Sequence, residues 1–412
     1  MTRRFEVLLH GDLVGYLSEQ ADGGSEMRFV EAYRRRGRRP VLGQKFEDDL
    51  ERVYRNRKRQ PLPDFFANLI PEGKLRRVIE EAGGLEKDDL LGLLEFVGRD
   101  LPGAVSVRLA AEGVAIEESA ESREPSARDP VSTEEREQFR FSLAGVQLKF
   151  SMLLEGEKLT LPASDRSGEW IAKFDSPTYP ELPENEYSML VWARESGFDV
   201  PECKLLSVDD VIGFPRRYGL DGTHVLAVRR YDRTPEGPVH QEDFAQAIGF
   251  PPEKKYDQIT HEAMALLTRR FVGPKAVEEL LRRLVFVIAS GNSDAHLKNW
   301  SLIYPTRIQA KLSPLYDQVS TVAWPAPAKE LSLKLAGVKH FSRIDRDAME
   351  RFAVKAGLEA ETGTEIVHET LEKLRQTWCD FGSDLPLPAE HKKALREHWK
   401  AVPLLREVGA LD

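Results

Sequence analysis

The chain has 412 residues, with 59 Lys and Arg against 68 Asp and Glu, which gives a formal net charge of -9 at pH 7. This balance argues against a protein that coats nucleic acid or binds a membrane through a polybasic surface. No apolar run approaches the roughly 20 residues that span a bilayer, the first residues lack the pattern of a signal peptide, and the two cysteines have no metal-like spacing. We therefore expect a soluble, cytoplasmic protein of two or three domains.

Residues 1–110 are predicted to form a small mixed α/β module. Within them, residues 5–20 alternate between apolar and polar positions on either side of a Gly-Asp turn, which is typical of two short strands. Residues 62–84 predict a helix, a break at proline, a second helix and a Gly-Gly stop. Residues 111–138 are acidic and rich in Ser and Pro, so we expect a linker or a long mobile loop there.

Strand patterns dominate residues 139–235. Residues 139–163 have the pattern of a β-hairpin, and further strands are predicted in EWIAKF (169–174) and THVLAVRRYDR (223–233). Between these two strands, residues 183–198 predict a helix, because their apolar positions recur at spacings of three and four. This part of the chain is therefore expected to form a β-rich lobe.

Residues 236–412 are predicted to form a helical lobe. In residues 273–291 the apolar side chains form one continuous stripe along a helix. Strands that come first and helices that come later predict an α+β fold with a β-rich lobe and a helical lobe, preceded by the small α/β module.

Polar residues in GNSDAHLKNW (291–300) come directly after the apolar helix. Two short strands follow, and PLYDQVST then presents Asp317. A helix, an Asp-x-x-x-x-Asn loop, a hairpin and a second Asp occur in this order in protein kinases, where the first Asp receives the substrate's hydroxyl proton and the others hold magnesium. Asp294 is therefore the candidate catalytic base, and Asn299 and Asp317 are the candidate magnesium ligands.

Candidates for binding the phosphates of ATP lie upstream. Lys173 is on a predicted strand, where a kinase keeps the lysine that bridges the α- and β-phosphates, and Glu186 on the next helix is its candidate partner, with Glu184 only two residues away. The glycine in SLAGVQLKF (142–150) permits close approach of the backbone to a phosphate. The candidate contacts in this loop are Ala144, Gly145, Val146, Gln147 and Lys149.

Five stretches, LPDFFANLIPEG, GRDLPGAV, SLAGVQLKF, GNSDAHLKN and LSPLYDQVS, occur in an order that resembles the HipA family of bacterial serine/threonine kinases, the toxins of HipBA-type toxin–antitoxin pairs. The resemblance covers nearly the whole chain. It implies a protein-kinase-like domain that uses ATP and magnesium, and a separate HipB-like helix-turn-helix antitoxin. It also implies an aminoacyl-tRNA synthetase or another translation protein as the substrate, with operator DNA contacted only indirectly or weakly.

The resemblance implies roles for further residues. Ser142 matches the loop serine that relatives autophosphorylate, which switches the enzyme off. Arg229 and Tyr231 lie in VRRYDR, where relatives often have Val-Glu-Arg-Phe-Asp-Arg beside the adenine, so that Arg229 replaces an acid. Within the catalytic loop, His296 is assigned to the ATP-binding set and is expected to pack the loop, and Lys298 is expected to touch the transferred phosphate.

Two other functions remain open. One is a binding module that acts as a co-repressor with a DNA-binding partner, and the complete set of Asp294, Asn299 and Asp317 argues against it. The other is a small-molecule kinase, because aminoglycoside and choline kinases share a related Asp-x-x-x-x-Asn loop, but the stretch LPDFFANLIPEG favours a protein kinase. The basic clusters at 34–39 and 55–59 are expected to be solvated surface, with contact to DNA or an acidic partner as the alternative.

Overall fold

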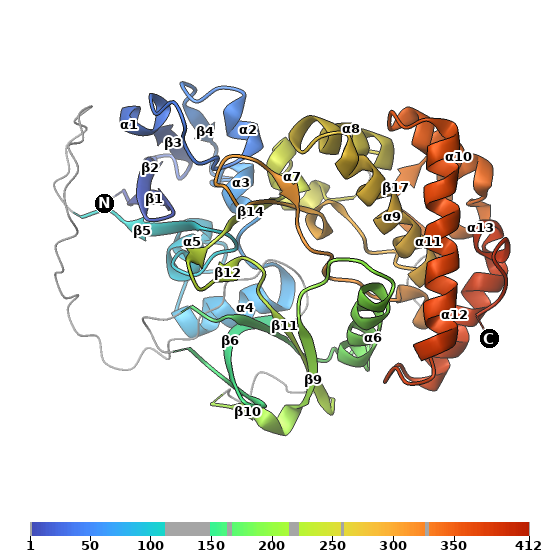
Figure 1. Ribbon diagram of the computed structural model, residues 1–412. Coiled ribbons are helices and arrows are strands. Elements are labelled where there is room, and N and C mark those ends of the chain that lie inside the picture. Colours follow the sequence, from blue (N-terminus) through green and yellow to red (C-terminus); the bar gives the residue numbers. More distant parts are fainter. Residues whose placement is uncertain are drawn as a thin grey trace.

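The computed structural model describes residues 2–111, 149–162, 167–213, 222–256, 259–325 and 329–411. In these ranges the chain forms an N-terminal α/β module, a β-rich lobe and a helical lobe (Figure 1). The predicted α+β fold in two lobes is confirmed. Among the described helices, none is long and apolar enough to cross a membrane. The predicted linker at 111–138 lies outside the described residues from 112 onward.

The N-terminal module is built on an antiparallel sheet in the order β4-β3-β2-β1-β5. Its strands are β1 (Arg4–Leu9), β2 (Asp12–Glu19), β3 (Ser25–Phe29), β4 (Tyr54–Asn56) and β5 (Val105–Leu109). The hairpin predicted over 5–20 is confirmed as β1 and β2. The turn between them has positive φ at His10 and Gly11, a conformation that a tight hairpin turn requires at both positions.

Helices connect the strands of the module. They are α1 (Glu31–Arg34), α2 (Gln44–Glu47), α3 (Asp64–Ala67), α4 (Gly73–Gly83) and α5 (Leu90–Val97). The helix, proline break and second helix predicted over 62–84 are confirmed as α3 and α4. The helix α4 ends at Gly84, which has φ +59 and closes the helix with backbone N–H bonds to Glu80 and Glu81, as a left-handed C-terminal glycine does.

The β-rich lobe is a twisted sheet in the order β10-β7-β6-β8-β11-β9. Its strands are β6 (Lys149–Glu155), β7 (Lys158–Thr160), β8 (Trp170–Lys173), β9 (Cys203–Ser207), β10 (Val211–Ile212) and β11 (His224–Arg229). The predicted hairpin is present as β6 and β7, and the predicted helix as α6 (Leu182–Glu195), which packs against β9 and β11.

The module and the β-rich lobe share one hydrophobic core. Phe150 and Met152 of β6 are fully buried in the same cluster as Phe66 of the module. An ionic contact joins the two parts as well, because the buried Arg230 guanidinium lies 2.8 Å from Asp100 of the module and 3.0 Å from Asp232 of its own segment. The attraction between these paired charges offsets the free-energy cost of removing them from water. The module is therefore fastened to the lobe that it precedes.

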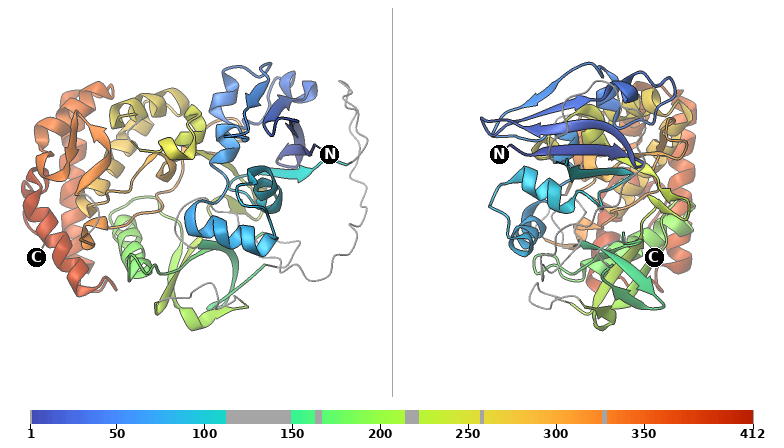
Figure 2. Two further views of the ribbon diagram at one scale, coloured as in Figure 1. Left: turned by 180° about the vertical axis from the view of Figure 1, so that it is seen from behind. Right: turned by 90° about the vertical axis from the view of Figure 1, so that its left-hand side faces the viewer.

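The helical lobe is held by a second core. Its helices are α7 (Phe244–Ile248), α8 (His261–Phe271), α9 (Lys275–Ser290), α10 (Arg346–Lys355), α11 (Ala360–Phe381), α12 (Ala389–Ala401) and α13 (Pro403–Arg406). The apolar stripe predicted over 273–291 is confirmed on α9, where Val277, Leu281 and Val285 are buried, and α9 packs against α8 and α11. Figure 2 shows the last helices at the opposite end of the molecule from the N-terminal module.

Short strand pairs connect the lobes and the helices. They are β12 (Arg233–Thr234) with β13 (Gly237–Pro238), β14 (His240–Asp243) with β15 (Ser301–Tyr304) and β16 (Lys311–Leu312), and β17 (Glu330–Leu335) with β18 (Val338–His340). The two strands predicted after the catalytic loop are confirmed as the antiparallel pair β15 and β16. This hairpin returns the chain toward the end of α9.

A buried carboxyl, Glu242 on β14, joins the helical lobe to the N-terminal module. It accepts the backbone N–H of Gln44 at 2.9 Å and the hydroxyl of Tyr304. Burial raises the pKa of Glu242 to about 8, because the charged form has lost its water and no cation among the described residues replaces it. A carboxyl with a raised folded-state pKa contributes stability at low pH, and that stability is lost as the pH rises toward 8.

We expect Glu242→Gln to stabilise the protein at pH 9 by about 1–2 kcal/mol relative to wild type, because the amide accepts the same bonds without a buried charge. At pH 5 the two proteins should differ little, since wild-type Glu242 is then protonated. Urea unfolding at the two pH values measures this, with the exposed Glu236→Gln as the matched control. A variant that is no more stable than wild type at pH 9 would contradict the expected cost of the buried charge.

Candidate active site

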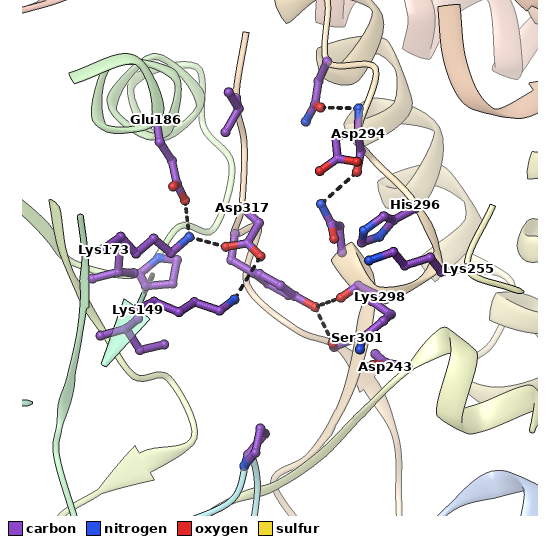
Figure 3. Close-up of a pocket in the computed structure, with 18 of the residues that line it drawn as sticks. Lys149, Lys173, Glu186, Asp243, Lys255, Asp294, His296, Lys298, Ser301 and Asp317 are labelled. Carbon is purple, nitrogen blue, oxygen red and sulfur yellow. Dashed lines mark hydrogen bonds and ion pairs between the residues drawn. The ribbon is translucent and has the colours of Figure 1, made fainter. Parts of the chain in front are cut away.

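A pocket of about 540 Å³ lies where the module and the two lobes meet. Residues from all three parts line it, including Asn68 of the module, Lys173 of the β-rich lobe and Asp294 of the helical lobe. Figure 3 shows the charged side chains converging on this space from opposite sides. The pocket is therefore formed only when the three parts are assembled.

The candidate catalytic loop, residues 291–300, begins where α9 ends, at Gly291. This residue has φ +64, and a Cβ there would meet the Val322 side chain at 2.6 Å, so the sharp exit from the helix requires glycine. The Asn292 side chain accepts the backbone N–H of Asp294 at 3.0 Å, and the Asn299 side-chain amide donates to the Asp294 carbonyl at 3.0 Å. The backbone of the loop is thereby fixed, while the Asp294 carboxylate stays exposed to the pocket.

Lys173, Glu186 and Asp317 form a buried ionic cluster (Figure 3). Lys173 extends from β8 and bonds both carboxylates, Glu186 from α6 and Asp317 from the segment that follows β16. Burial alone would lower the pKa of the Lys173 ammonium, but the two carboxylates outweigh burial and raise it. Lys173 is therefore held charged at one end of the pocket.

Asp317 is placed by an unusual backbone conformation. Its φ is +50, in the left-handed region that Asp adopts more readily than most residues. The carboxylate also lies 3.9 Å from the Lys149 ammonium and keeps 27% exposure of its side chain. Burial would raise the pKa of Asp317, but Lys173 and Lys149 outweigh it and lower the pKa, so the group is an anion facing the pocket.

Lys149 and Lys298 supply two further ammonium groups to the pocket. Burial lowers the pKa of Lys149 from its usual value, although the Asp317 charge works in the opposite direction. Lys298 is almost fully buried on the catalytic loop, where its ammonium pairs with Glu72 of the module. Both lysines therefore line the pocket beside a carboxylate, Lys149 beside Asp317 and Lys298 beside Glu72.

His296 lines the pocket from within the catalytic loop. The residue is 7% exposed, and burial lowers the pKa of its imidazole to about 4, so the ring is neutral at pH 7. Its Nδ1 atom has no hydrogen-bond partner among the described residues. A neutral ring with a free nitrogen fits the expected packing role and leaves one polar atom for a ligand.

Arg229 and Tyr231 line the pocket from the end of β11 and the residues after it. The Arg229 side chain is exposed and lies 3.4 Å from the Glu202 carboxylate. The Tyr231 hydroxyl donates to Gln241, and its ring lies 5.8 Å from that of Tyr316. Tyr231 thus forms part of an aromatic wall.

Several predicted loop residues lie outside the described part of the chain. They are Ser142, Ala144, Gly145, Val146 and Gln147. Of that loop only its last predicted contact, Lys149, is described, as the first residue of β6.

Sequence reasoning missed Lys255 and Tyr256, which line the pocket, and Glu72, which pairs with two of the lysines that line it. Glu72 bonds the Lys298 ammonium and lies 3.2 Å from that of Lys255. Burial works to raise the pKa of Glu72, but the two lysines outweigh it and lower the pKa. The signal for Glu72 was available in LPDFFANLIPEG, a stretch used above only for the family resemblance.

The architecture is that of a protein-kinase-like fold. A β-rich lobe contributes a Lys–Glu pair to the pocket, and a helical lobe contributes the loop that carries Asp294. Two family models match the chain, the HipA N-terminal domain over residues 5–108 and the HipA-like C-terminal domain over residues 141–378. The chain belongs to the HipA family.

The chain is also similar to individual proteins. The putative kinase Y4dM of Sinorhizobium fredii is 37% identical over 407 residues, which cover 98% of each chain. The serine/threonine-protein kinase toxin HipA of Shewanella oneidensis is 25% identical over 300 residues, which cover 66% of each chain. A chain in the solved complex of HipA, HipB and operator DNA from Shewanella oneidensis superposes with a TM-score of 0.72 at 20% identity, covering 98% of this chain and 99% of that one.

Proposed function

We propose that this protein is an ATP- and magnesium-dependent serine/threonine protein kinase and the toxin of a toxin–antitoxin pair. The observation that carries the proposal is the arrangement of the pocket. Lys173, paired with Glu186 and Asp317, faces the exposed Asp294 of the catalytic loop across it. Phosphoryl transfer needs a cation that binds the phosphates and a carboxylate that accepts the proton of a hydroxyl. Here the two groups lie on opposite sides of one pocket (Figure 3).

The residues present fit a magnesium ion. Asn299 donates its amide N–H to the Asp294 carbonyl, which leaves its side-chain oxygen as a ligand, and Asp317 offers a carboxylate. Magnesium prefers oxygen ligands and is commonly held by one or two protein groups together with phosphate oxygens and water. When bound, the ion would supply positive charge that neutralises the phosphates. Among the described residues, no group of three or more His, Cys, Asp or Glu side chains is arranged to hold a metal ion. We propose Asn299 and Asp317 as the protein ligands of the magnesium ion.

Each of the charged residues in the pocket would have a separate role in phosphoryl transfer. Lys173 and Lys149 would bind phosphate oxygens, and Lys298 would face the phosphate that is transferred. Asp294 would accept the proton of the attacking hydroxyl. Because all of these groups are held by the folded protein before substrate binds, catalysis would consist mainly of positioning and electrostatic stabilisation.

Membership of the HipA family supports a proposal for the partner and for the substrate. We infer that a separate HipB-like antitoxin binds this chain, because the structure that superposes on it comes from a complex of HipA, HipB and operator DNA. An aminoacyl-tRNA synthetase or another translation protein is the proposed substrate. Contact with operator DNA would be indirect or weak, since guanidiniums of the basic cluster at 34–39 pair with acids of the same module, among them Arg34 with Glu51 and Arg39 with Glu47.

The test of the proposed function is transfer of label from ATP. Purified protein incubated with γ-labelled ATP and magnesium in a bacterial lysate should label at least one protein band, and mass spectrometry then identifies it. A co-repressor without catalysis would label nothing. A small-molecule kinase would place the label in the filtrate that passes a protein-retaining membrane.

Autophosphorylation of Ser142 is a further part of the proposal. Prolonged incubation with ATP should yield the peptide FSLAGVQLK carrying one phosphate, together with a falling rate of transfer to substrate. A phosphate adds about -1.5 to -2 charge at neutral pH, and the ATP phosphates would repel it. Mass spectrometry that finds this peptide unmodified in a protein active on other substrates would defeat the prediction.

A further inference from the structure

The carboxylate of Asp294 already has a hydroxyl donor. The Tyr256 hydroxyl donates to Asp294 Oδ1 at 2.7 Å. The other bonds of Asp294 are made by its backbone, to the side chains of Asn292 and Asn299 and to the N–H of His296. Within the described part of the chain, no other side chain donates a hydrogen bond to this carboxylate.

Tyr256 is held at the edge of the pocket without being buried there. Its ring packs edge-on against His296, with centroids 5.0 Å apart and planes at 74°, and the ammonium of Lys255 lies 5.6 Å from the ring centroid. The residue nevertheless keeps 39% exposure. Its position is therefore defined by the catalytic loop, while its exposed side leaves room for it to move aside.

The hydrogen bond between Tyr256 and Asp294 has the same chemistry as the bond that a substrate hydroxyl would make. In phosphoryl transfer the attacking hydroxyl must donate its hydrogen bond to the catalytic carboxylate, at about 2.6–3.2 Å between heavy atoms. The Tyr256 phenol is such a hydroxyl at such a distance. A substrate hydroxyl that approaches Asp294 Oδ1 from the same side must therefore compete with the phenol.

Building on the kinase function proposed above, we propose that the Tyr256 hydroxyl holds the place of the acceptor hydroxyl at Asp294 and that a substrate binds by displacing it. In the absence of substrate, the phenol keeps water from the same position. Tyr256 thereby lowers the rate at which ATP is lost to hydrolysis and selects acceptors that bind well enough to displace it.

The effect of the Tyr256–Asp294 hydrogen bond can be measured through the hydrolysis of ATP by water, even though the protein substrate is not known. In that reaction a water oxygen forms a bond to the γ-phosphorus, the bond from this phosphorus to the β–γ bridging oxygen breaks, and ADP leaves. Asp294 takes the proton of the water. Tyr256→Phe keeps the ring and its packing against His296 but removes the competing hydroxyl.

We expect Tyr256→Phe to raise magnesium-dependent ATP hydrolysis about threefold to tenfold, since a hydrogen bond to a charged group no longer opposes entry of water. The affinity for a fluorescent ADP should stay unchanged, because the phenol does not bind Lys173, Asn299 or Asp317. Tyr54→Phe is the matched control, since it removes a hydroxyl that donates to the Asp49 carbonyl outside the pocket. In the double variant Tyr256→Phe with Asp294→Asn, the gain should disappear.

Other results would overturn the inference. Equal or slower hydrolysis by Tyr256→Phe, with nucleotide affinity intact, would mean that the phenol orients Asp294 rather than holding the acceptor's place. A phosphate found on Tyr256 by mass spectrometry would make it an acceptor instead. If wild type binds ADP but neither it nor the variant hydrolyses or transfers any phosphate, the proposed kinase function fails and the inference fails with it.

Discussion

Asp294→Asn is expected to lower the rate of phosphoryl transfer by about 10²–10⁴-fold, the usual contribution of a general base. The substitution keeps the shape of the side chain and an oxygen that accepts the Tyr256 hydroxyl, but it removes the charge that takes the proton. Nucleotide affinity should change little, because the proposed phosphate and metal contacts are made by Lys173, Asn299 and Asp317. The measurement is the initial rate of label transfer beside a titration with fluorescent ADP.

The control for this variant is Asp380→Asn, which removes an exposed carboxylate on α11 outside the pocket. Its transfer rate should equal that of wild type. If expression of the wild type arrests bacterial growth, Asp294→Asn should relieve the arrest while still binding the antitoxin. A variant that arrests growth as strongly as wild type would favour the binding-module function over the kinase.

Asp317→Asn is expected to lower transfer by about 10²–10³-fold and to remove the effect of magnesium on nucleotide affinity. Asparagine is the suitable replacement because residue 317 has φ +50, which Asn adopts with less strain than Ala. The variant therefore tests the charge of the ligand rather than the backbone. Titration of fluorescent ADP with magnesium and with EDTA separates the two contributions.

Two outcomes distinguish the role of Asp317 from a purely structural one. Loss of the carboxylate leaves Lys173 paired with Glu186, so the fold should persist, which thermal unfolding would verify. If magnesium still tightens ADP binding in Asp317→Asn as it does in wild type, Asp317 is not a metal ligand.

Local patterns made most of the fold and the core of the candidate site predictable. The apolar stripe of α9 fixed the helix, and Gly291 marked its end, so the polar residues from Asp294 onward had to follow on a loop. The β15–β16 hairpin then explains how Asp317 returns to the same pocket. The positions of these residues can be predicted from spacing along the chain, because Asp294 follows shortly after one helix end and a single hairpin lies between Asp294 and Asp317.

Contacts between distant segments could not be read in the same way. Glu72 meets Lys298 across 226 positions, and Tyr256 meets Asp294 across 38, with no periodicity that relates the partners. Alternation along β11, continued to the next residue, predicts that Arg229 and Arg230 point to opposite sides. It does not predict which of them is buried against Asp100. Such pairings depend on how the module and lobes pack, which is set by the shared core rather than by local pattern.

The most direct test of the central claim is the chemical identity of the labelled product. Wild type and Asp294→Asn are each incubated with γ-labelled ATP and magnesium in lysate, and the protein fraction is hydrolysed in acid and separated into phosphoamino acids. Label on phosphoserine or phosphothreonine with wild type, reduced about 10²–10⁴-fold in the variant, is the predicted result. Equal label from both proteins, or label found only in small molecules, would contradict it.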